Sequence, residues 1–141
     1  MKVLITGSKG FVGRNLEPKI KAAGYEVISV DCRQCYGEPY IRAQIATIVE
    51  VIEKVDVVIH LAAHTNVGRG ENKKATYFRN NISSTIDALE MAVNVGARKF
   101  IYLSTAEVLG YSKTSNDYLR VNAGYKPTSV YGASKAAGEM I

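Results

Sequence analysis

The chain has 141 residues, of which 47% are hydrophobic and 22% are charged, and its formal net charge is +5. This composition is typical of one globular domain with a buried core. The basic residues are scattered, with Lys73-Lys74 as the longest run, so no nucleic-acid partner is expected. Met1 leads directly into an apolar strand pattern and no apolar run is long enough to span a membrane, which predicts a cytoplasmic protein without a membrane partner.

Strand and helix patterns alternate along the whole chain. Runs rich in Val, Ile and Leu predict strands at 2–6, 25–30, 39–42, 56–62 and 98–103. The segments between them predict helices at 11–23, 46–54, 75–95 and from 129 onward. Within the third helix, Ile82, Ile86, Leu89 and Val93 follow helical spacing, and Gly96 is expected to end it. This order predicts an α/β fold, a Rossmann-type doubly wound parallel sheet forming a single domain over residues 1–141.

Several residues do not fit a simple pattern. Pro18 lies inside the first predicted helix, which should therefore either kink near Asn15 or start anew there. Cys32 and Cys35 form an isolated C-x-x-C, and without a second pair of ligands they are expected to be free thiols, so no metal site is predicted. His60 is expected to be a buried, hydrogen-bonded core residue, and His64 to line a ligand cleft.

A glycine-rich loop connects the first strand to the first helix. It reads Thr6-Gly7-Ser8-Lys9-Gly10-Phe11-Val12-Gly13, in which Gly7 permits a tight turn, Gly10 lets the backbone approach a pyrophosphate, and Gly13 allows close helix packing. The helix N-terminus offers N–H groups to the anion. Asp31 ends the second strand and is expected to accept from the ribose hydroxyls, so NAD is the predicted cofactor. Arg33 could favour NADP, but Asp31 is expected to dominate.

Tyr131 precedes Lys135 by four residues at the start of the last predicted helix. A free tyrosine has a pKa of about 10, too high for a base at neutral pH, and a nearby ammonium group would lower it. The spacing places both side chains on one helix face. The pair therefore predicts proton transfer beside a nicotinamide, although a buried aromatic residue with an extended lysine is the alternative.

Six segments together resemble a known family, the extended short-chain dehydrogenase/reductases, in particular the NAD-dependent epimerase/dehydratases that act on nucleotide sugars. The similar segments are the loop at 6–13, Asp31, H-L-A-A at 60–63, R-N-N-I at 79–82, S-T-A-E-V-L-G at 104–110 and P-T-S-V-Y-G-A-S-K-A-A-G-E at 127–139. They follow the family's order over the whole chain.

The resemblance implies a role for individual residues. Thr105 matches the family's catalytic Ser or Thr, which orients the reacting oxygen, and Tyr131 and Lys135 match its catalytic Tyr and Lys, which also contact the cofactor. Other matches imply cofactor contacts: Leu61, Ala62 and Ala63 along the cofactor, Asn81 near the nicotinamide, and Gln44 with the adjacent Ile45 near the adenine. The implied partners are a nucleotide-sugar substrate and a second copy of the chain, joined through the helices at 75–95 and 129–141.

The chain also departs from the family pattern. Ala106-Glu107 stands where dehydratases have Asp-Glu, which disfavours a 4,6-dehydratase, and Leu109 replaces a common tyrosine. Nothing corresponds to the smaller sugar-binding domain, so the fold is expected to be C-terminally truncated relative to the family. The sequence therefore predicts the N-terminal cofactor-binding part of an NAD-dependent epimerase-type oxidoreductase, inactive by itself. The alternative is an NAD-binding module or interaction protein with no turnover, and the identity of the sugar stays open.

Overall fold

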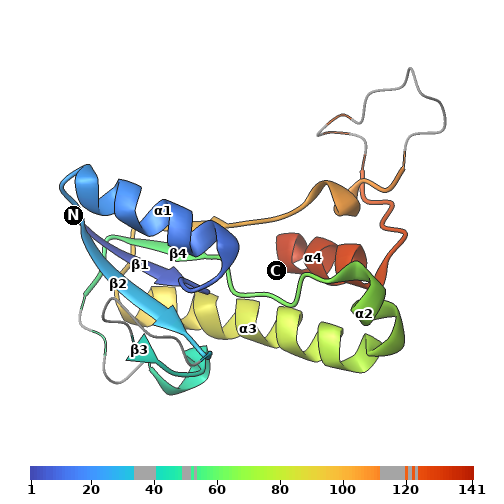
Figure 1. The fold of residues 1–141 in the computed structure, drawn as a ribbon, viewed down its shortest axis with the longest axis horizontal. Coiled ribbons are helices and arrows are strands. Elements are labelled where there is room, and N and C mark those ends of the chain that lie inside the picture. The colour runs from blue at the N-terminus through green and yellow to red at the C-terminus, as the bar shows by residue number, and fades with distance from the viewer. Residues whose placement is uncertain (34–40, 49–51, 53, 112–119, 121, 123) are drawn as a thin grey trace. The chain divides into compact units, whose positions relative to one another are not determined.

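The computed structural model describes residues 1–33, 41–48, 52, 54–111, 120, 122 and 124–141 (Figure 1). These residues form two compact units. Unit 1 comprises Met1–Ala63 and Ser84–Leu103, and unit 2 comprises His64–Ser83 and Ser104–Ile141. The long helix α3 (Lys74–Asn94) contributes its first part to unit 2 and its second part to unit 1.

Unit 1 is built on a parallel five-stranded sheet. Its strands are β1 (Lys2–Thr6), β2 (Glu26–Asp31), β3 (Ile41–Arg42), β4 (Val57–His60) and β5 (Lys99–Tyr102). Their order is β3-β2-β1-β4-β5, so the chain winds outward from β1 to β3 and then returns to the other side of β1. This arrangement confirms the predicted doubly wound sheet, and it places a topological switch between β1 and β4, where such sheets bind ligands.

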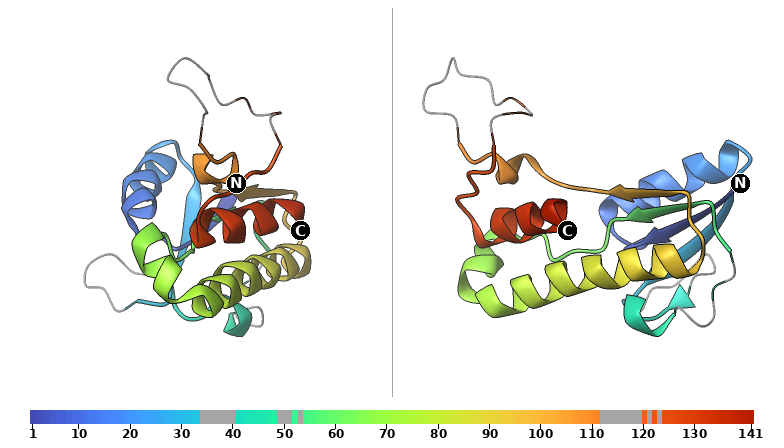
Figure 2. Two further views of the ribbon diagram at one scale, coloured as in Figure 1. Left: turned by 90° about the vertical axis from the view of Figure 1, so that its right-hand side faces the viewer. Right: turned by 180° about the vertical axis from the view of Figure 1, so that it is seen from behind.

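Helices cover both faces of this sheet (Figures 1 and 2). Along β1, Val3 and Ile5 face helix α1 (Phe11–Ala22), where they pack with Ile59, Leu16 and Ile20. Leu4 faces the opposite way and packs with the second part of α3. The alternation along a strand therefore serves two apolar layers, which explains why the strand patterns are almost continuously hydrophobic.

The strand register brings the carboxyl ends of the central strands to one edge. Thr6, the last residue of β1, lies opposite Val30 on one side and His60 on the other. The segments that follow β1, β2 and β4 therefore leave the sheet at the same edge.

Two details of unit 1 differ from the sequence-based expectation. Helix α1 runs without interruption from Phe11 to Ala22 with Pro18 inside it, so a new start near Asn15 is wrong. The helix expected at 46–54 is wrong at its described positions, because only a 3-10 turn, η1 (Ile45–Thr47), forms there. The Thr47 hydroxyl donates to the Gln44 carbonyl at 2.9 Å, a local bond that competes with a regular helix. Residues 49–51 and 53, and residues 39–40 of the third predicted strand, lie outside the described part.

Unit 2 contains α2 (Val67–Asn72), the first part of α3, the 3-10 turn η2 (Ala106–Val108) and α4 (Val130–Met140). The sequence did not predict α2, because Gly68 and Gly70 lower its helix propensity. Its cap is nevertheless regular, since Asn66 Oδ1 accepts from the Arg69 N–H at 2.8 Å. The predicted end of α3 is confirmed: the Gly96 N–H donates to the Val93 carbonyl, with Gly96 at a φ of +67°. None of the helices in the described residues is long and apolar enough to span a membrane.

Candidate functional site

The loop after β1 in unit 1 is held tightly against the segment after β4. Gly7 has a φ of +68°, and a Cβ there would lie 2.7 Å from the Ala62 backbone nitrogen. A Cβ at Gly13 would lie 2.6 Å from backbone atoms of Ser8. Any side chain at either position would collide with backbone, so the loop requires glycine at both. The expected tight turn is confirmed, and Gly13 packs closely against Ser8 of the loop.

The N-terminus of α1 faces this loop without a side-chain cap. Gly10 is the N-cap, it makes no side-chain hydrogen bond, and its carbonyl accepts from the Arg14 N–H at 3.0 Å. Phe11 and Val12 expose 87% and 42% of their surface. The N–H groups of a first helical turn have no intrahelical partner and carry a partial positive charge. This terminus is therefore suited to an anion such as a pyrophosphate.

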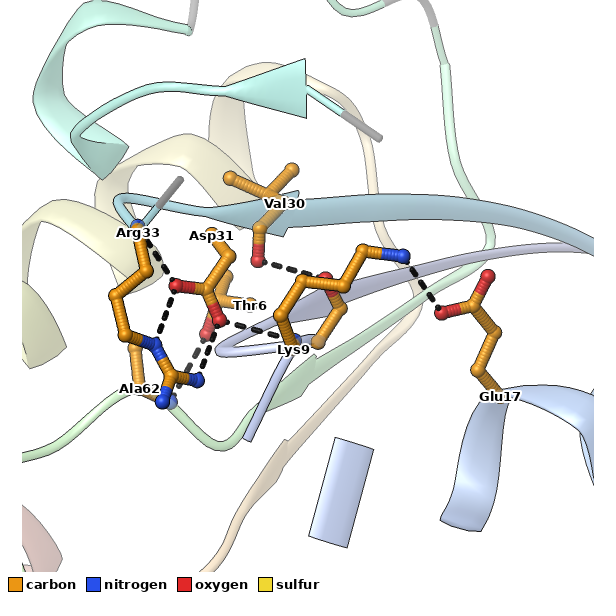
Figure 3. Close-up of polar contacts among 8 residues, drawn as sticks. Thr6, Lys9, Glu17, Val30, Asp31, Arg33 and Ala62 are labelled. Carbon is orange, nitrogen blue, oxygen red and sulfur yellow. Dashed lines mark hydrogen bonds and ion pairs between the residues drawn. The ribbon is translucent and has the colours of Figure 1, made fainter. Parts of the chain in front are cut away.

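Asp31 ends β2 beside the loop and is 4% exposed. Its carboxylate accepts from the Lys9 N–H at 2.9 Å and from the Arg33 N–H at 2.9 Å. The Arg33 guanidinium adds a fork, with Nε donating to Oδ1 and Nη2 to Oδ2, both at 3.0 Å (Figure 3). Burial raises the pKa of Asp31, but the hydrogen bonds from Arg33 and Lys9 outweigh it and hold the pKa below its ordinary value.

Lys9 belongs to the loop, but its side chain points away from Asp31. Its Nζ lies 3.7 Å from Oε2 of Glu17 on α1 (Figure 3). The Nζ of Lys21 lies 2.9 Å from the other carboxylate oxygen of Glu17. Lys9 and Glu17 are both buried, at 9% and 6% exposure. This ion pair ties the loop to α1, so Lys9 has a structural role that its place in the motif did not reveal.

The other expected cofactor residues of unit 1 lie near the same edge or in the core. Leu61 and Ala62 are half-buried beside the loop, with the Leu61 N–H donating to the Thr6 carbonyl at 3.1 Å, and Ala63 follows them. Gln44 is exposed at the start of η1, whereas Ile45 is buried in the core. A ligand beside this turn would therefore meet the Gln44 side chain and only the backbone of Ile45.

His60 is the buried core residue that the sequence predicted. It is fully buried, and Thr6 Oγ1 lies 2.8 Å from its Nδ1 and Thr85 Oγ1 3.3 Å from its Nε2. Its ring stacks against the rings of Phe100 and Tyr102. With both nitrogens in use, His60 fixes the end of β4.

In unit 2, three side chains hold the N-terminus of α4, the helix that carries Tyr131. Ser129 is the N-cap, and its hydroxyl accepts from the Gly132 N–H at 3.0 Å and donates to Glu107 at 2.8 Å. Glu71, on α2, accepts from the Val130 N–H at 2.9 Å. Two carboxylates thus face the positive end of the helix dipole, an arrangement that stabilises this end. The predicted start of this helix at 129 is confirmed, and a Ser just before a helical pattern is an N-cap signal. No signal in the sequence indicated the contact of Glu71 with this helix.

Tyr131 and Thr105 lie together in unit 2, joined by a hydrogen bond between their side chains. Burial raises the pKa of Tyr131, a hydrogen bond with Thr105 lowers it, the Glu107 charge raises it, and the net pKa lies above the ordinary value of 10.0. Burial lowers the pKa of Lys135 to about 8, although the Glu139 charge raises it. The expected lowering of the Tyr131 pKa by Lys135 is therefore wrong for this structure, because burial and Glu107 act on the phenol instead.

Asn81 links the segment after β4 to α4 within unit 2. Its Oδ1 accepts from the His64 N–H at 2.8 Å, and its Nδ2 donates to the His64 carbonyl at 3.1 Å and to Ser134 Oγ at 2.8 Å. Ser134 in turn donates to the Tyr131 carbonyl at 2.8 Å. Asn81 is 1% exposed. The side chain thus supports α4, and its expected position near a nicotinamide stays a prediction.

The predicted site residues therefore fall into two sets. The predicted cofactor-binding residues Gly7, Gly10, Gly13, Asp31, Leu61 and Ala62 lie in unit 1. The predicted catalytic residues Thr105, Tyr131 and Lys135 lie in unit 2, as does Asn81. His64 is exposed, and its Nε2 lies 2.9 Å from Asn80 Nδ2. Cys32 is an exposed free thiol, and Cys35 lies outside the described residues.

Comparisons with known proteins agree with this geometry. The family model described as "NAD dependent epimerase/dehydratase family" matches residues 3–141. A dTDP-D-glucose 4,6-dehydratase from Dictyostelium discoideum is 30% identical, over 99% of this chain and 39% of its own length. A UDP-glucose 4-epimerase from Streptomyces lividans is 31% identical, over 96% of this chain and 45% of its own length.

The fold agrees as well. A dTDP-glucose 4,6-dehydratase from Streptomyces venezuelae, solved with NAD bound, superposes with a TM-score of 0.88 at 25% identity, covering 99% of this chain and 50% of the other. The chain thus spans half or less of the length of these three proteins.

Proposed function

Because the chain belongs to the NAD dependent epimerase/dehydratase family, we propose that it is the NAD-binding part of a nucleotide-sugar epimerase-type oxidoreductase. The observation that carries the proposal is the edge of unit 1 where the tight turn at Gly7, the uncapped N-terminus of α1 and the carboxylate of Asp31 meet. Each matches one part of a dinucleotide: turn and helix end suit the pyrophosphate, and the carboxylate suits a ribose.

The proposed chemistry assigns a proton-handling role to three residues of unit 2. When bound, NAD supplies the acceptor for a hydride leaving a sugar carbon. Tyr131 takes the proton of the sugar hydroxyl, and Thr105, which hydrogen-bonds the phenol, orients the reacting oxygen. Lys135 is protonated at neutral pH, since its pKa lies near 8, and supplies a positive charge on the same helix. Ser129, Glu71 and Glu107 hold that helix end in place.

A binding experiment tests the cofactor assignment. Titration calorimetry should show NAD binding that weakens in Asp31→Ala by about 1–3 kcal/mol, the usual value of a hydrogen bond to a charged group. Asp56→Ala is the matched control, because Asp56 pairs with Arg98 at the amino edge of the same sheet. Tighter binding of NADP than of NAD by the native chain would refute the assignment.

Turnover tests the catalytic assignment in a form of the protein that converts a nucleotide sugar. Tyr131→Phe should abolish hydride transfer and leave NAD binding intact, and Thr105→Val should lower the rate by about 10²-fold. Normal turnover by Tyr131→Phe would show that the assigned base is wrong. A longer form of the protein that binds NAD and turns over no nucleotide sugar would instead be an NAD-binding module, a reading favoured by the raised pKa of Tyr131.

We further propose that a second copy of the chain covers an apolar stripe on the second part of α3. The stripe consists of Ile86, Leu89 and Val93, and Ile86 and Val93 expose 39% and 78% of their surface. The core face of α3 is formed by other residues, Ala88, Met91 and Ala92. Sedimentation should show a dimer that dissociates in Val93→Glu and persists in the control Asn94→Glu. A monomeric native chain would refute this interface.

A further inference from the structure

The Arg33 side chain binds the Asp31 carboxylate, the group with which a ribose of the cofactor would form hydrogen bonds. Its guanidinium donates to both oxygens of Asp31, and the backbone N–H groups of Lys9 and Arg33 donate to the same two oxygens. A carboxylate has about four lone-pair sites, and these four bonds use them (Figure 3). A ribose hydroxyl can therefore reach Asp31 only by replacing one of these donors.

We propose that the Arg33 side chain competes with the adenosine ribose of the cofactor for Asp31, and so determines how strongly the site separates a 2′-hydroxyl from a 2′-phosphate. The inference rests on the proposed NAD site and names the residue that sets its specificity.

Of the donors to Asp31, the Arg33 guanidinium is the one that a ribose hydroxyl would displace. The two backbone N–H groups are fixed, one by the loop after β1 and the other by the chain two residues beyond Asp31. The Arg33 side chain is 55% exposed, whereas that of Asp31 is 3% exposed. Moving Arg33 outward therefore returns its charge to water at small cost, because ion pairs with an exposed partner contribute little.

The guanidinium also lies where a phosphate would approach. A Cβ at Gly10 would lie 3.5 Å from Arg33 Nη2, so the guanidinium sits beside the glycine whose backbone faces the anion. While paired, Arg33 neutralises Asp31 and weakens the repulsion that a bare carboxylate exerts on a 2′-phosphate. Once released, its planar fork matches phosphate oxygens. Arg33 thus opposes NAD and assists NADP.

The test compares matched arginine variants of the chain by calorimetry with NAD and NADP. Arg33→Ala should bind NAD about two- to fivefold more tightly than the native chain, the size expected for removing a partly exposed ion pair. It should bind NADP about tenfold more weakly, through loss of a charged phosphate contact. Arg98→Ala removes the same charge from the Arg98–Asp56 pair at the other edge of the sheet and should change neither affinity.

A double variant isolates the competition. If Arg33 acts through Asp31, Arg33→Ala should not tighten NAD binding in an Asp31→Asn background, where the carboxylate is absent. NAD binding by the native chain that is unchanged or weakened in Arg33→Ala would overturn the inference and leave the proposed function standing. NAD binding by neither the native chain nor Arg33→Ala would overturn both, and binding gained only in Arg33→Ala would support both. Circular dichroism of each variant tests whether it is folded, so that a change in affinity is not caused by unfolding.

Discussion

The hydroxyl of Ser129 joins the carboxylate of Glu107, 22 positions earlier in the chain, to the first turn of the helix that carries Tyr131. Ser129 donates to Glu107 Oε2 at 2.8 Å and accepts from the Gly132 N–H at 3.0 Å. A Cβ at Gly132 would lie 2.7 Å from the Glu107 carbonyl oxygen, so the glycine after Tyr131 permits this close packing. The turn at η2 and the start of α4 therefore form one hydrogen-bonded corner of unit 2.

Removing the Ser129 hydroxyl should destabilise this corner. Ser129→Ala is expected to lower the free energy of unfolding by about 1 kcal/mol, because the helix loses its cap and Glu107 loses a donor. Urea unfolding followed by circular dichroism measures the change. Ser83→Ala, at an exposed position within α3, is the control and should leave stability nearly unchanged. Equal effects of the two substitutions would contradict a capping role.

The pKa of Tyr131 should respond in opposite directions to its two polar neighbours. Glu107→Gln removes a negative charge that raises the pKa, so the pKa should fall, whereas Thr105→Val removes a hydrogen bond that lowers it, so the pKa should rise. Carbon NMR of chains with labelled tyrosine rings resolves the titration. Tyr125 is an internal control, since its pKa is raised through a hydrogen bond to Glu139 and should not change. A rise in Glu107→Gln would refute this account.

Burial of Lys135 makes the stability of the chain depend on pH. Its folded pKa is about 8, below the ordinary 10.5, so the unfolded state binds more protons between these values. The free energy of unfolding should therefore rise with pH across this window. Lys135→Met, which removes a buried charge, should be more stable than the native chain at pH 7, on the order of 1–2 kcal/mol.

The advantage of Lys135→Met should shrink as the pH approaches 10, because the native lysine is then neutral in the fold. Parallel urea titrations of the variant and the native chain at pH 7 and pH 9.5 measure the difference in their free energies of unfolding. The contributions of other titrating groups cancel in this difference, because both chains contain them. Lys126→Met, at an exposed position, is the control and should show no such pH dependence. An equal difference in the free energy of unfolding between Lys135→Met and the native chain at both pH values would contradict the pKa assigned to Lys135.

Glu17 should contribute stability at neutral pH that is lost in acid. Burial raises its pKa, but contacts with Lys21, Ser29 and Lys9 outweigh burial and hold the pKa below 4.5. Glu17→Gln should lower stability at pH 7 by roughly 2–4 kcal/mol, since it leaves Lys9 buried beside an uncharged partner. Because the folded pKa of Glu17 is lowered, the extra stability of the native chain over Glu17→Gln is present above pH 4.5. It disappears as the pH falls through the folded pKa.

Unfolding of the Glu17→Gln chain at pH 7 and pH 3 measures this loss. Glu26→Gln is the control, because Glu26 makes a comparable ion pair with Lys2 at 3.0 Å but is exposed. Its substitution should cost less than about 1 kcal/mol at either pH. A Glu17→Gln effect as small as the control would show that the buried pair does not stabilise the loop.

The sequence alone determined the strands, the parallel character of their sheet and the residues of the phosphate loop, because these depend on local chemistry. Apolar runs reveal strands covered on both faces, and only glycine tolerates the backbone at Gly7. The Tyr131 and Lys135 spacing likewise follows from one turn of α4. Family membership could be read from the same segments, since each motif sits in a short contiguous stretch.

The ion pairs and the pKa values of individual side chains were decided only by the tertiary structure. The sequence assigned Asp31 to a ribose, but the fold places Arg33 on both of its oxygens. It assigned Lys9 to the loop, but the Lys9 side chain pairs with Glu17 on α1. It placed Lys135 as the group that lowers the Tyr131 pKa, but burial and Glu107 dominate there. A pKa or an ion pair depends on which charges lie within a few ångströms in space, and spacing along the chain does not determine that.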